Sequence, residues 1–174
     1  ETTYLNFVYE ALKDPDGSIS GIVVIASEVT ESVIDKRNVE EREQRVRALI
    51  KNTPFPMAVY VGEDMRIELA NKAIIDIWGK GEDVIGKSFR EVLPELDNQL
   101  VFQQIENVFR SGKPFHTQNT PLELIVDGTP RHYYFNYSFT PLYDSSANIY
   151  GVMNTGADVT DLNIAKKKIE ESDK

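Results

Sequence analysis

The sequence predicts an α+β fold, in which a five-stranded antiparallel sheet carries short helices on one face. Two observations lead to this prediction. Two strand-like segments are followed by several short helical segments and then by three more strands, and such grouped runs favour an antiparallel sheet. Hydrophobic residues make up 41% of the 174 residues and aromatic residues 10%, which is enough to fill a core.

A pattern of strand, turn, strand and helix occurs twice. Val29-Thr30 matches Val159-Thr160 at an offset of 130 residues (159 − 29), and the same offset holds without gaps on both sides. It aligns Tyr4 with Tyr134, Asn6 with Asn136, Leu12 with Leu142, Asp14 with Asp144, Ile19 with Ile149, Gly21 with Gly151, Ile34 with Ile164, Lys36 with Lys166, and Glu40-Glu41 with Glu170-Glu171. Chance rarely keeps one register for so long, so we expect the last part of one unit, followed by a complete second unit.

The first copy predicts a β-hairpin over residues 1–30, because "YLNFVYEAL" and "ISGIVVIASEV" flank the turn-rich "KDPDGS". Two strands alone are marginally stable, so we expect this hairpin to pair with another sheet edge, for instance in a second chain. Residues 31–52 then predict a charged helix with a thin apolar stripe of Val39, Val46, Leu49 and Ile50. The stripe fits either a helix lying on its own domain or a seam between two chains.

The complete unit begins with two short strands, at residues 57–61 and 66–70, around a polar turn. Asn71 is suited to cap the helix over residues 72–78, and Gly79 is suited to end it.

Two further helices follow. Ser88 and Glu91 have the spacing of a capping box, and Pro94 ends the short helix that they open. The next helix ends at Gly112 and Pro114, and its apolar face consists of Val101, Phe102, Ile105, Val108 and Phe109.

Three strands complete the unit. Residues 121–139 predict a hairpin around an Asp127-Gly128 turn, and its second strand also opens the final hairpin, which ends near residue 158. A helix over 161–174 then starts beside Thr160 and an acidic residue, a favourable helix start. Its apolar face would comprise Val159, Leu162, Ala165 and Ile169.

Four motifs, in order over roughly residues 45–160, make this unit resemble a PAS domain, the small sensory module of bacterial signalling proteins. They are "ANKA" at 70–73, "VIGKSFREVLPE" at 84–95, "FTPLYD" with "IYGV" at 139–152, and "DVT" at 158–160. The last resembles the Asp-(Ile/Val)-Thr motif that joins a PAS core to its outgoing signalling helix. The first copy departs from that motif by carrying Glu28 in place of Asp.

The resemblance implies a domain organisation. Residues 1–30 would be the C-terminal hairpin of a preceding PAS unit, 31–52 a connecting helix, 53–160 a complete PAS domain, and 161–174 the start of a coiled-coil output helix. Asp158, Val159 and Thr160 would form the signal junction.

The resemblance also implies a cavity beneath the helices. Strand alternation places Tyr133, Phe135, Tyr137 and Phe139 on one side, and in PAS domains that side faces the cavity. The pocket candidates are therefore Phe102, Ile105, Phe109, Tyr133, Phe135, Tyr137, Phe139, Met153 and Thr155. They could line a pocket for a flat or apolar ligand, or fill the space as an ordinary core; we favour the core.

No cofactor is predicted, although an unidentified small ligand is left open. The chain has no cysteine, so the cysteine-bound flavin of photosensory PAS domains is excluded. Haem is disfavoured because the long helix carries no His, and no metal site is expected at His116 or His132, which lie in predicted strands. No nucleotide-binding or catalytic motif occurs, so no catalytic residue is assigned.

We therefore expect a sensory and dimerising PAS module that detects a small molecule or relays an upstream signal to an output domain. The expected parent is a two-component sensor histidine kinase of a bacterial phosphorelay; the alternatives are a diguanylate cyclase, a transcription regulator or, least favoured, a small-molecule enzyme using the same cavity. The expected partners are a second copy, through the flanking helices, and the output domain in the same chain. The net charge of −9 disfavours nucleic acid and anionic membranes, and with no membrane-length apolar run or basic leader we expect a cytoplasmic location.

Overall fold

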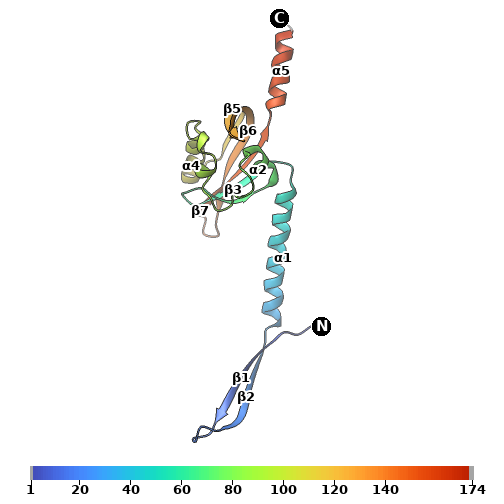
Figure 1. Cartoon of the computed structure of the whole chain (residues 1–174), viewed down its shortest axis with the longest axis vertical. Coiled ribbons are helices and arrows are strands. Elements are labelled where there is room, and N and C mark those ends of the chain that lie inside the picture. The colour runs from blue at the N-terminus through green and yellow to red at the C-terminus, as the bar shows by residue number, and fades with distance from the viewer. Residues whose placement is uncertain (1, 173–174) are drawn as a thin grey trace. The chain divides into compact units, whose positions relative to one another are not determined.

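The computed structural model describes residues 2–172, and the chain forms two compact units that divide between Ala48 and Leu49. Figure 1 traces the elements in chain order. They are β1 (Leu5–Lys13), β2 (Ile19–Glu28), α1 (Thr30–Asn52), β3 (Met57–Val61), β4 (Arg66–Ala70), α2 (Lys72–Trp78), α3 (Phe89–Val92), the 3-10 helix η1 (Pro94–Leu96), α4 (Val101–Ser111), β5 (Phe115–Val126), β6 (Thr129–Tyr143), β7 (Ile149–Asp158) and α5 (Thr160–Ser172).

The first unit is the predicted hairpin, followed by most of α1. Its turn is fixed by local chemistry: Asp16 accepts hydrogen bonds from the backbone N–H and the hydroxyl of Ser18, and Gly17 takes a positive φ of 87°. No residue of α1 is buried, and Val39, Val46 and Leu49 are all exposed. Of the apolar stripe, only Ile50 is half-buried, and the other three residues are exposed.

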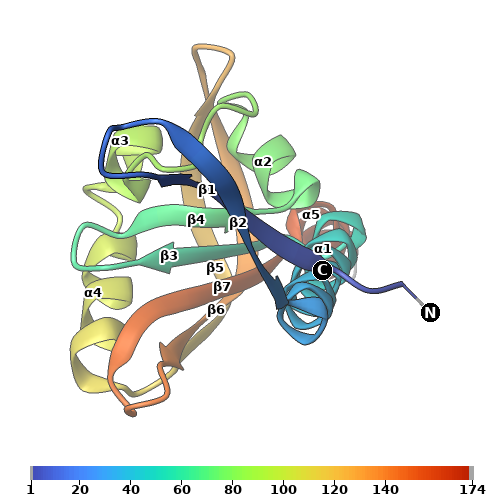
Figure 2. The same cartoon turned by 90° about the horizontal axis from the view of Figure 1, so that it is seen from below.

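The second unit is built on a five-stranded antiparallel sheet in the order β4-β3-β7-β6-β5. The α+β class with short helices is as the sequence predicts. Figure 2 shows the strands together with α2, α3 and α4. Buried side chains from these helices and from the sheet form one core, in which the Tyr60 and Phe89 rings lie 4.5 Å apart and the Phe89 and Phe102 rings 5.3 Å apart.

The local helix signals act as the sequence predicts. Asn71 caps α2, and Gly79 ends it in the left-handed conformation. Ser88 and Glu91 form a capping box, with the hydroxyl accepting from the Glu91 N–H and the carboxylate accepting from the Ser88 N–H. Asp127 and Gly128 form the β5–β6 turn with positive φ.

The starts of two elements differ from the sequence prediction. β5 begins at Phe115 instead of residue 121, because a register shift between Thr117 and Thr120 lets the strand continue through a local irregularity. The last helix begins at Thr160 and is described to Ser172, so the final two residues of the predicted output helix lie outside the described part. No helix within residues 2–172 is long and apolar enough to span a membrane.

Both edges of the five-stranded sheet are covered over part of their length. At β4 the cover is backbone: the N–H of Ile67 donates to the carbonyl of Lys87, and the N–H of Gly86 donates to the carbonyl of Ile67. At β5 the cover is side chains, and it satisfies both backbone groups of two residues. Gln99 bonds both backbone groups of Glu123, Glu95 accepts from the N–H of Ile125, and Lys80 donates to the carbonyl of Ile125. Such cover keeps foreign strands from adding to an edge.

Candidate functional site

An apolar cavity of about 60 Å³ lies between the sheet and the helices of the second unit. Three of the predicted pocket residues line it: Phe135, Tyr137 and Phe139. The remaining lining comes mainly from residues that the sequence did not single out. They are Pro56, Ile74, Ile77, Trp78, Phe89, Leu93, Leu96, Val101, Leu122, Leu124, Asn154, Gly156 and Ala157.

Other candidates from the helix and from β6 lie beside the cavity without lining it. Phe102 and Ile105 are fully buried in the core, while Phe109 and Tyr133 are half-buried against it. Tyr133 stacks on Phe135 with ring centroids 5.5 Å apart. These side chains therefore pack in the core around the cavity.

The assignment of Met153 and Thr155 to the cavity was wrong. Directly opposed residues on neighbouring strands share a face, and the inward Phe139 pairs with Asn154 while the inward Tyr137 pairs with Gly156. Met153 and Thr155 therefore point to the other face, where Thr155 borders an open groove. The register depends on a bulge between Leu142 and Tyr143, which alternation within one strand does not reveal.

Few polar groups reach the cavity. The Tyr137 hydroxyl donates to Gln104 Oε1 at 2.6 Å, and Asn154 Nδ2 donates to the Tyr60 hydroxyl at 3.1 Å. Burial raises the pKa of both tyrosines above its ordinary value, so both stay neutral at physiological pH. The Asn154 Oδ1 atom is buried and has no hydrogen-bond partner within the described chain.

The volume of the cavity limits what it holds in this conformation. An apolar cavity that takes up benzene measures about 150 Å³, and this one measures about 60 Å³. A flat ring system would therefore have to displace core side chains, at a substantial cost in packing. This geometry favours a core filled by its own side chains.

The exit from the sheet is a hydrogen-bonded junction at the predicted residues. Thr160 Oγ1 accepts from the backbone N–H of Tyr134 at 2.9 Å, and the N–H of Val159 donates to the carbonyl of Tyr134 at 2.8 Å. Asp158 Oδ1 accepts from the N–H and the hydroxyl of Thr160. One threonine thus starts α5 and fastens it to the neighbouring strand β6.

The side chain of Tyr134 also contacts α5, one to two turns beyond Thr160. Lys167 Nζ donates to the Tyr134 hydroxyl at 3.0 Å and lies 4.9 Å from the ring centroid. Asn163 Nδ2 donates to Asn119 Oδ1 at 2.9 Å, which adds a contact to β5. The first turns of α5 are therefore attached to β6 and β5, the two strands beyond β7.

The entry to the sheet depends on Asn71, the single buried polar residue among those described, with 1% of its surface exposed. Its Oδ1 accepts from the N–H of Met57 at 3.0 Å and from the N–H of Ile74 at 3.1 Å. Its Nδ2 donates to the carbonyl of Phe55 at 2.7 Å, with a longer contact of 3.4 Å to that of Ile50. One amide therefore ties the last turn of α1 and the segment after it to both β3 and α2.

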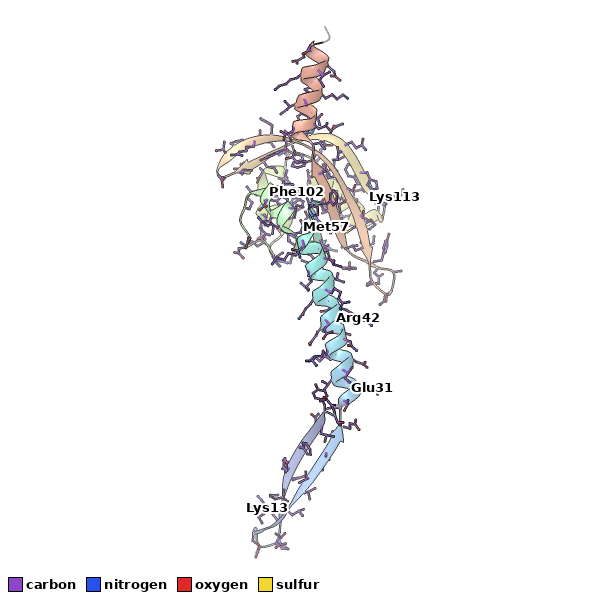
Figure 3. All side chains as sticks on the ribbon, turned by 90° about the vertical axis from the view of Figure 1, so that its right-hand side faces the viewer. Lys13, Glu31, Arg42, Met57, Phe102 and Lys113 are labelled. Atoms are coloured by element: carbon purple, nitrogen blue, oxygen red, sulfur yellow. The ribbon has the colours of Figure 1, made fainter. Side chains whose placement is uncertain are left out.

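Entry and exit lie at the same end of the sheet. Met57 pairs with Thr155, and the N–H of Gly156 donates to the carbonyl of Pro56 at 3.1 Å. Two residues after Gly156 the chain reaches Asp158 and the exit junction. Figure 3 labels Met57 where α1 runs into the sheet. One backbone hydrogen bond and a few residues of β7 therefore connect the entry segment to the start of α5.

Several of these residues were missed or undervalued from sequence. Asn71 was identified only as a helix cap, because its three carbonyl contacts come from residues 16 to 21 positions earlier in the chain. The recurrence of tyrosine at positions 4 and 134, in register with the two threonines, was the available signal for Tyr134.

Neither histidine lies in a metal-binding cluster, and no group of three or more candidate ligands exists within residues 2–172. His116 Nδ1 lies 2.7 Å from the hydroxyl of Ser138, and His132 lies 3.4 Å from Glu123 at the surface.

Comparisons with known proteins agree with this geometry. A family model described as the PAS fold matches residues 50–163. The PAS domain of Bordetella pertussis BvgS aligns at 24% identity with a TM-score of 0.53, covering 76% of this chain and 98% of that domain. A PAS domain from Colwellia psychrerythraea aligns at 16% identity with a TM-score of 0.52, covering 68% and 97%. Vibrio cholerae VqmA aligns at 24% identity with a TM-score of 0.53, covering 68% of this chain and 53% of VqmA.

Proposed function

Because this chain belongs to the PAS-fold family, we propose that its second unit is a relay module, which passes a signal from α1 to α5. The observation that carries the proposal is the meeting of the two junctions at one end of the sheet, joined by the Pro56–Gly156 hydrogen bond. The cavity of about 60 Å³ supports relay over the detection of a large ligand.

The relay works through strand position. A movement of the end of α1 changes the pull that Asn71 transmits to Met57, and β3 passes it to β7 through their paired residues. The exit junction at Asp158, Val159 and Thr160 converts a shift of β7 into a change in how α5 leaves the sheet. Such a device needs two packed arrangements of α5 that differ by a few kcal/mol.

A small ligand would act on the same path. The cavity is lined at one end by Pro56, Gly156 and Ala157, which lie between the two junctions. The unpartnered Oδ1 of Asn154 would accept a hydrogen bond from such a ligand. Binding of such a ligand would change the position of β7 directly.

Two copies are expected to associate through the flanking helices. Leu162 and Ile169 on α5 are exposed and lie seven residues apart, as do the exposed Val39 and Val46 on α1. Apolar residues at this spacing on a helix without cover favour a two-helix seam. A paired output helix would give the relay its two alternative packings.

The wider context remains part of the proposal. We place the module in the cytoplasm, without a catalytic residue or cofactor of its own, inside a two-component sensor histidine kinase. A diguanylate cyclase or a transcription regulator would use the same α5, and the natural sequence after residue 174 distinguishes these parents. A small-molecule enzyme in the cavity is the least supported alternative, since the inward polar groups are neutral tyrosines and amides.

The test replaces Thr160 with Val, which keeps the shape and removes the hydroxyl. Loss of the hydroxyl's hydrogen bonds to Tyr134 and Asp158 should cost about 1 kcal/mol, so the amides of the first two turns of α5 should exchange hydrogen about five times faster. In the full-length parent, the output should lose its response to the input while its basal level changes less. Thr160→Ser is the matched control, because it keeps the hydroxyl and should preserve both readouts.

A normal response of the parent carrying Thr160→Val, with α5 demonstrably loosened, would refute the relay through this junction. A native mass spectrum adds two independent observations. Bare protein mass and a dimer are expected; a bound mass that dissociates on unfolding would shift the proposal from relay to sensing, and a monomer at all concentrations would remove the helix seam.

A further inference from the structure

The hairpin β1–β2 repeats the hairpin β6–β7 in hydrogen-bond register. Leu5 pairs with Glu28 as Phe135 pairs with Asp158, and each later pair follows at the same offset of 130 residues. Both ladders shift register at the same place, between Leu12 and Lys13 and between Leu142 and Tyr143. A bulge at one conserved position of two ladders marks a shared architecture beyond a generic hairpin.

The start of the following helix is repeated as well. Thr30 Oγ1 accepts from the N–H of Tyr4 at 3.0 Å, and the N–H of Val29 donates to the carbonyl of Tyr4 at 2.9 Å. These are the contacts that Thr160 and Val159 make with Tyr134 in the second unit. The hairpin β1–β2 therefore ends in the same pair of contacts as the hairpin β6–β7.

The two hairpins differ in what covers them. The inward residues of β6 and β7 are buried, with Tyr137 8% and Val152 0% exposed, whereas their counterparts Phe7 and Ile22 are 52% and 66% exposed. The apolar character at these positions is the same in both copies. Figure 3 shows the side chains of β1 and β2 projecting from the strands.

The hairpin edges are also open. In the second unit β7 pairs with β3 along Gly151–Thr155 and β6 pairs with β5, whereas within residues 2–172 the sheet of β1 and β2 has no third strand. The central residues of β2, Gly21–Ile25, are the counterparts of the stretch that binds β3. A two-stranded sheet with exposed apolar faces and free edges is at best marginally stable alone in water.

The sheet edges of a second copy are covered over part of their length. The sheet edge at β4 is bonded to Gly86 and Lys87, and the edge at β5 is bonded to the side chains of Gln99, Glu95 and Lys80. Over these stretches neither edge has free groups to accept a foreign strand. In the second unit, residues that precede β6 and β7 in the chain pair with these strands and cover their apolar face. The hairpin β1–β2 lacks this pairing and this cover.

We infer that β1 and β2 are the last two strands of a second PAS sheet, completed by a segment of the same protein that precedes residue 1. That segment would supply an antiparallel strand beside Gly21–Ile25, a strand beside Leu5–Tyr9, and helices over the face of Phe7 and Ile22. Since the family match begins at residue 50 and the offset is 130, the segment would span about 80 residues. The inference does not depend on the relay proposal.

The test compares the 174-residue chain with the natural protein that includes the residues preceding Glu1, by hydrogen exchange resolved to short peptides. The amides of β1 and of Gly21–Ile25 should exchange at least about 100-fold more slowly in the longer protein, because they join a buried sheet. Equal exchange in the two proteins would overturn the inference, and so would a natural sequence without a segment of this kind.

Two adjacent substitutions separate the faces. Phe7 and Val8 are similarly exposed, at 52% and 57%, but only Phe7 is the counterpart of a buried residue. Phe7→Asp should abolish the protection in the longer protein, while Val8→Asp should retain it; in the 174-residue chain both should have the same small effect. Protection that is already present in the 174-residue chain and grows with its concentration would assign the hairpin to a second copy and overturn the inference.

Discussion

Replacing Asn71 with Ala is expected to destabilise the second unit by about 3 kcal/mol. The helix cap accounts for about 1 kcal/mol of this loss. The N–H of Met57 and the carbonyl of Phe55, bonded to Asn71 at 3.0 and 2.7 Å, would lose their partners, at a cost of at least about 1 kcal/mol each. The side chain is 1% exposed, so water replaces it poorly.

The assay is equilibrium urea unfolding followed by the fluorescence of Trp78, the single tryptophan of the chain, which is buried in the same unit. In thermal unfolding, the same loss of about 3 kcal/mol corresponds to a Tm lower by about 10 °C. Asn71→Asp keeps the acceptor for Met57 and Ile74 but places a buried carboxylate oxygen against the carbonyl of Phe55, so it should be at least as destabilising as Asn71→Ala. The exposed Asn98 provides the control, and Asn98→Ala should stay within about 0.5 kcal/mol of the wild type.

A stability of Asn71→Ala indistinguishable from that of Asn98→Ala would refute this reasoning. It would mean that the segment from Ile50 to Phe55 is not held to β3 in solution. The entry half of the proposed relay would then have no anchor.

Three further predictions follow from single contacts. Burial raises the pKa of Tyr137 and Tyr60, so their contribution to stability is complete below pH about 10 and is lost as the pH rises further. The pH midpoint of alkaline unfolding should therefore be higher in Tyr137→Phe than in the wild type. An unchanged midpoint would contradict the burial argument. Gly151→Ala should destabilise the second unit by about 2 kcal/mol or more, since the new Cβ would lie 2.5 Å from the carbonyl oxygen of Tyr60 and push β7 from β3. Thermal unfolding measures this loss of stability. A Tm within about 2 °C of the wild type, on the order of 0.5 kcal/mol, would contradict the prediction. Burial opposes the ionisation of Glu95, but the hydrogen bonds from Lys80 and Ile125 outweigh this effect and lower the pKa of the carboxyl group. Glu95 therefore stabilises the fold at neutral pH and loses this effect as the pH falls below the ordinary pKa of a glutamate. Lys80→Met should move acid unfolding to higher pH, and an unchanged midpoint would show that the pair does not hold the β5 edge.

The local elements could be predicted from the sequence because their signals are short-range. In their capping contacts, Asn71, Gly79, Ser88 and Glu91 act on backbone groups within four residues, and the bounds of α2 agree with the prediction. The bounds of β3 and β4, which were predicted from short strand patterns around a polar turn, agree as well. The repeat also needed no structure, since its residues align without gaps.

The face of β7 could not be predicted in the same way. Alternation within β6 correctly grouped Phe135, Tyr137 and Phe139, but the residues of β7 that join them depend on the register between two strands. Because of a single bulge, Val152 and Asn154 face the helices in place of Met153 and Thr155.

The sequence by itself determined the order of the elements, the helix caps and the recurrence of one exit junction, because each depends on residues close together in the chain. Tertiary structure alone decided which residues line the cavity, how small it is, and that Asn71 and the Pro56–Gly156 bond bring the entry beside the exit. These features arise where segments distant in sequence meet, and there packing and strand register fix the outcome.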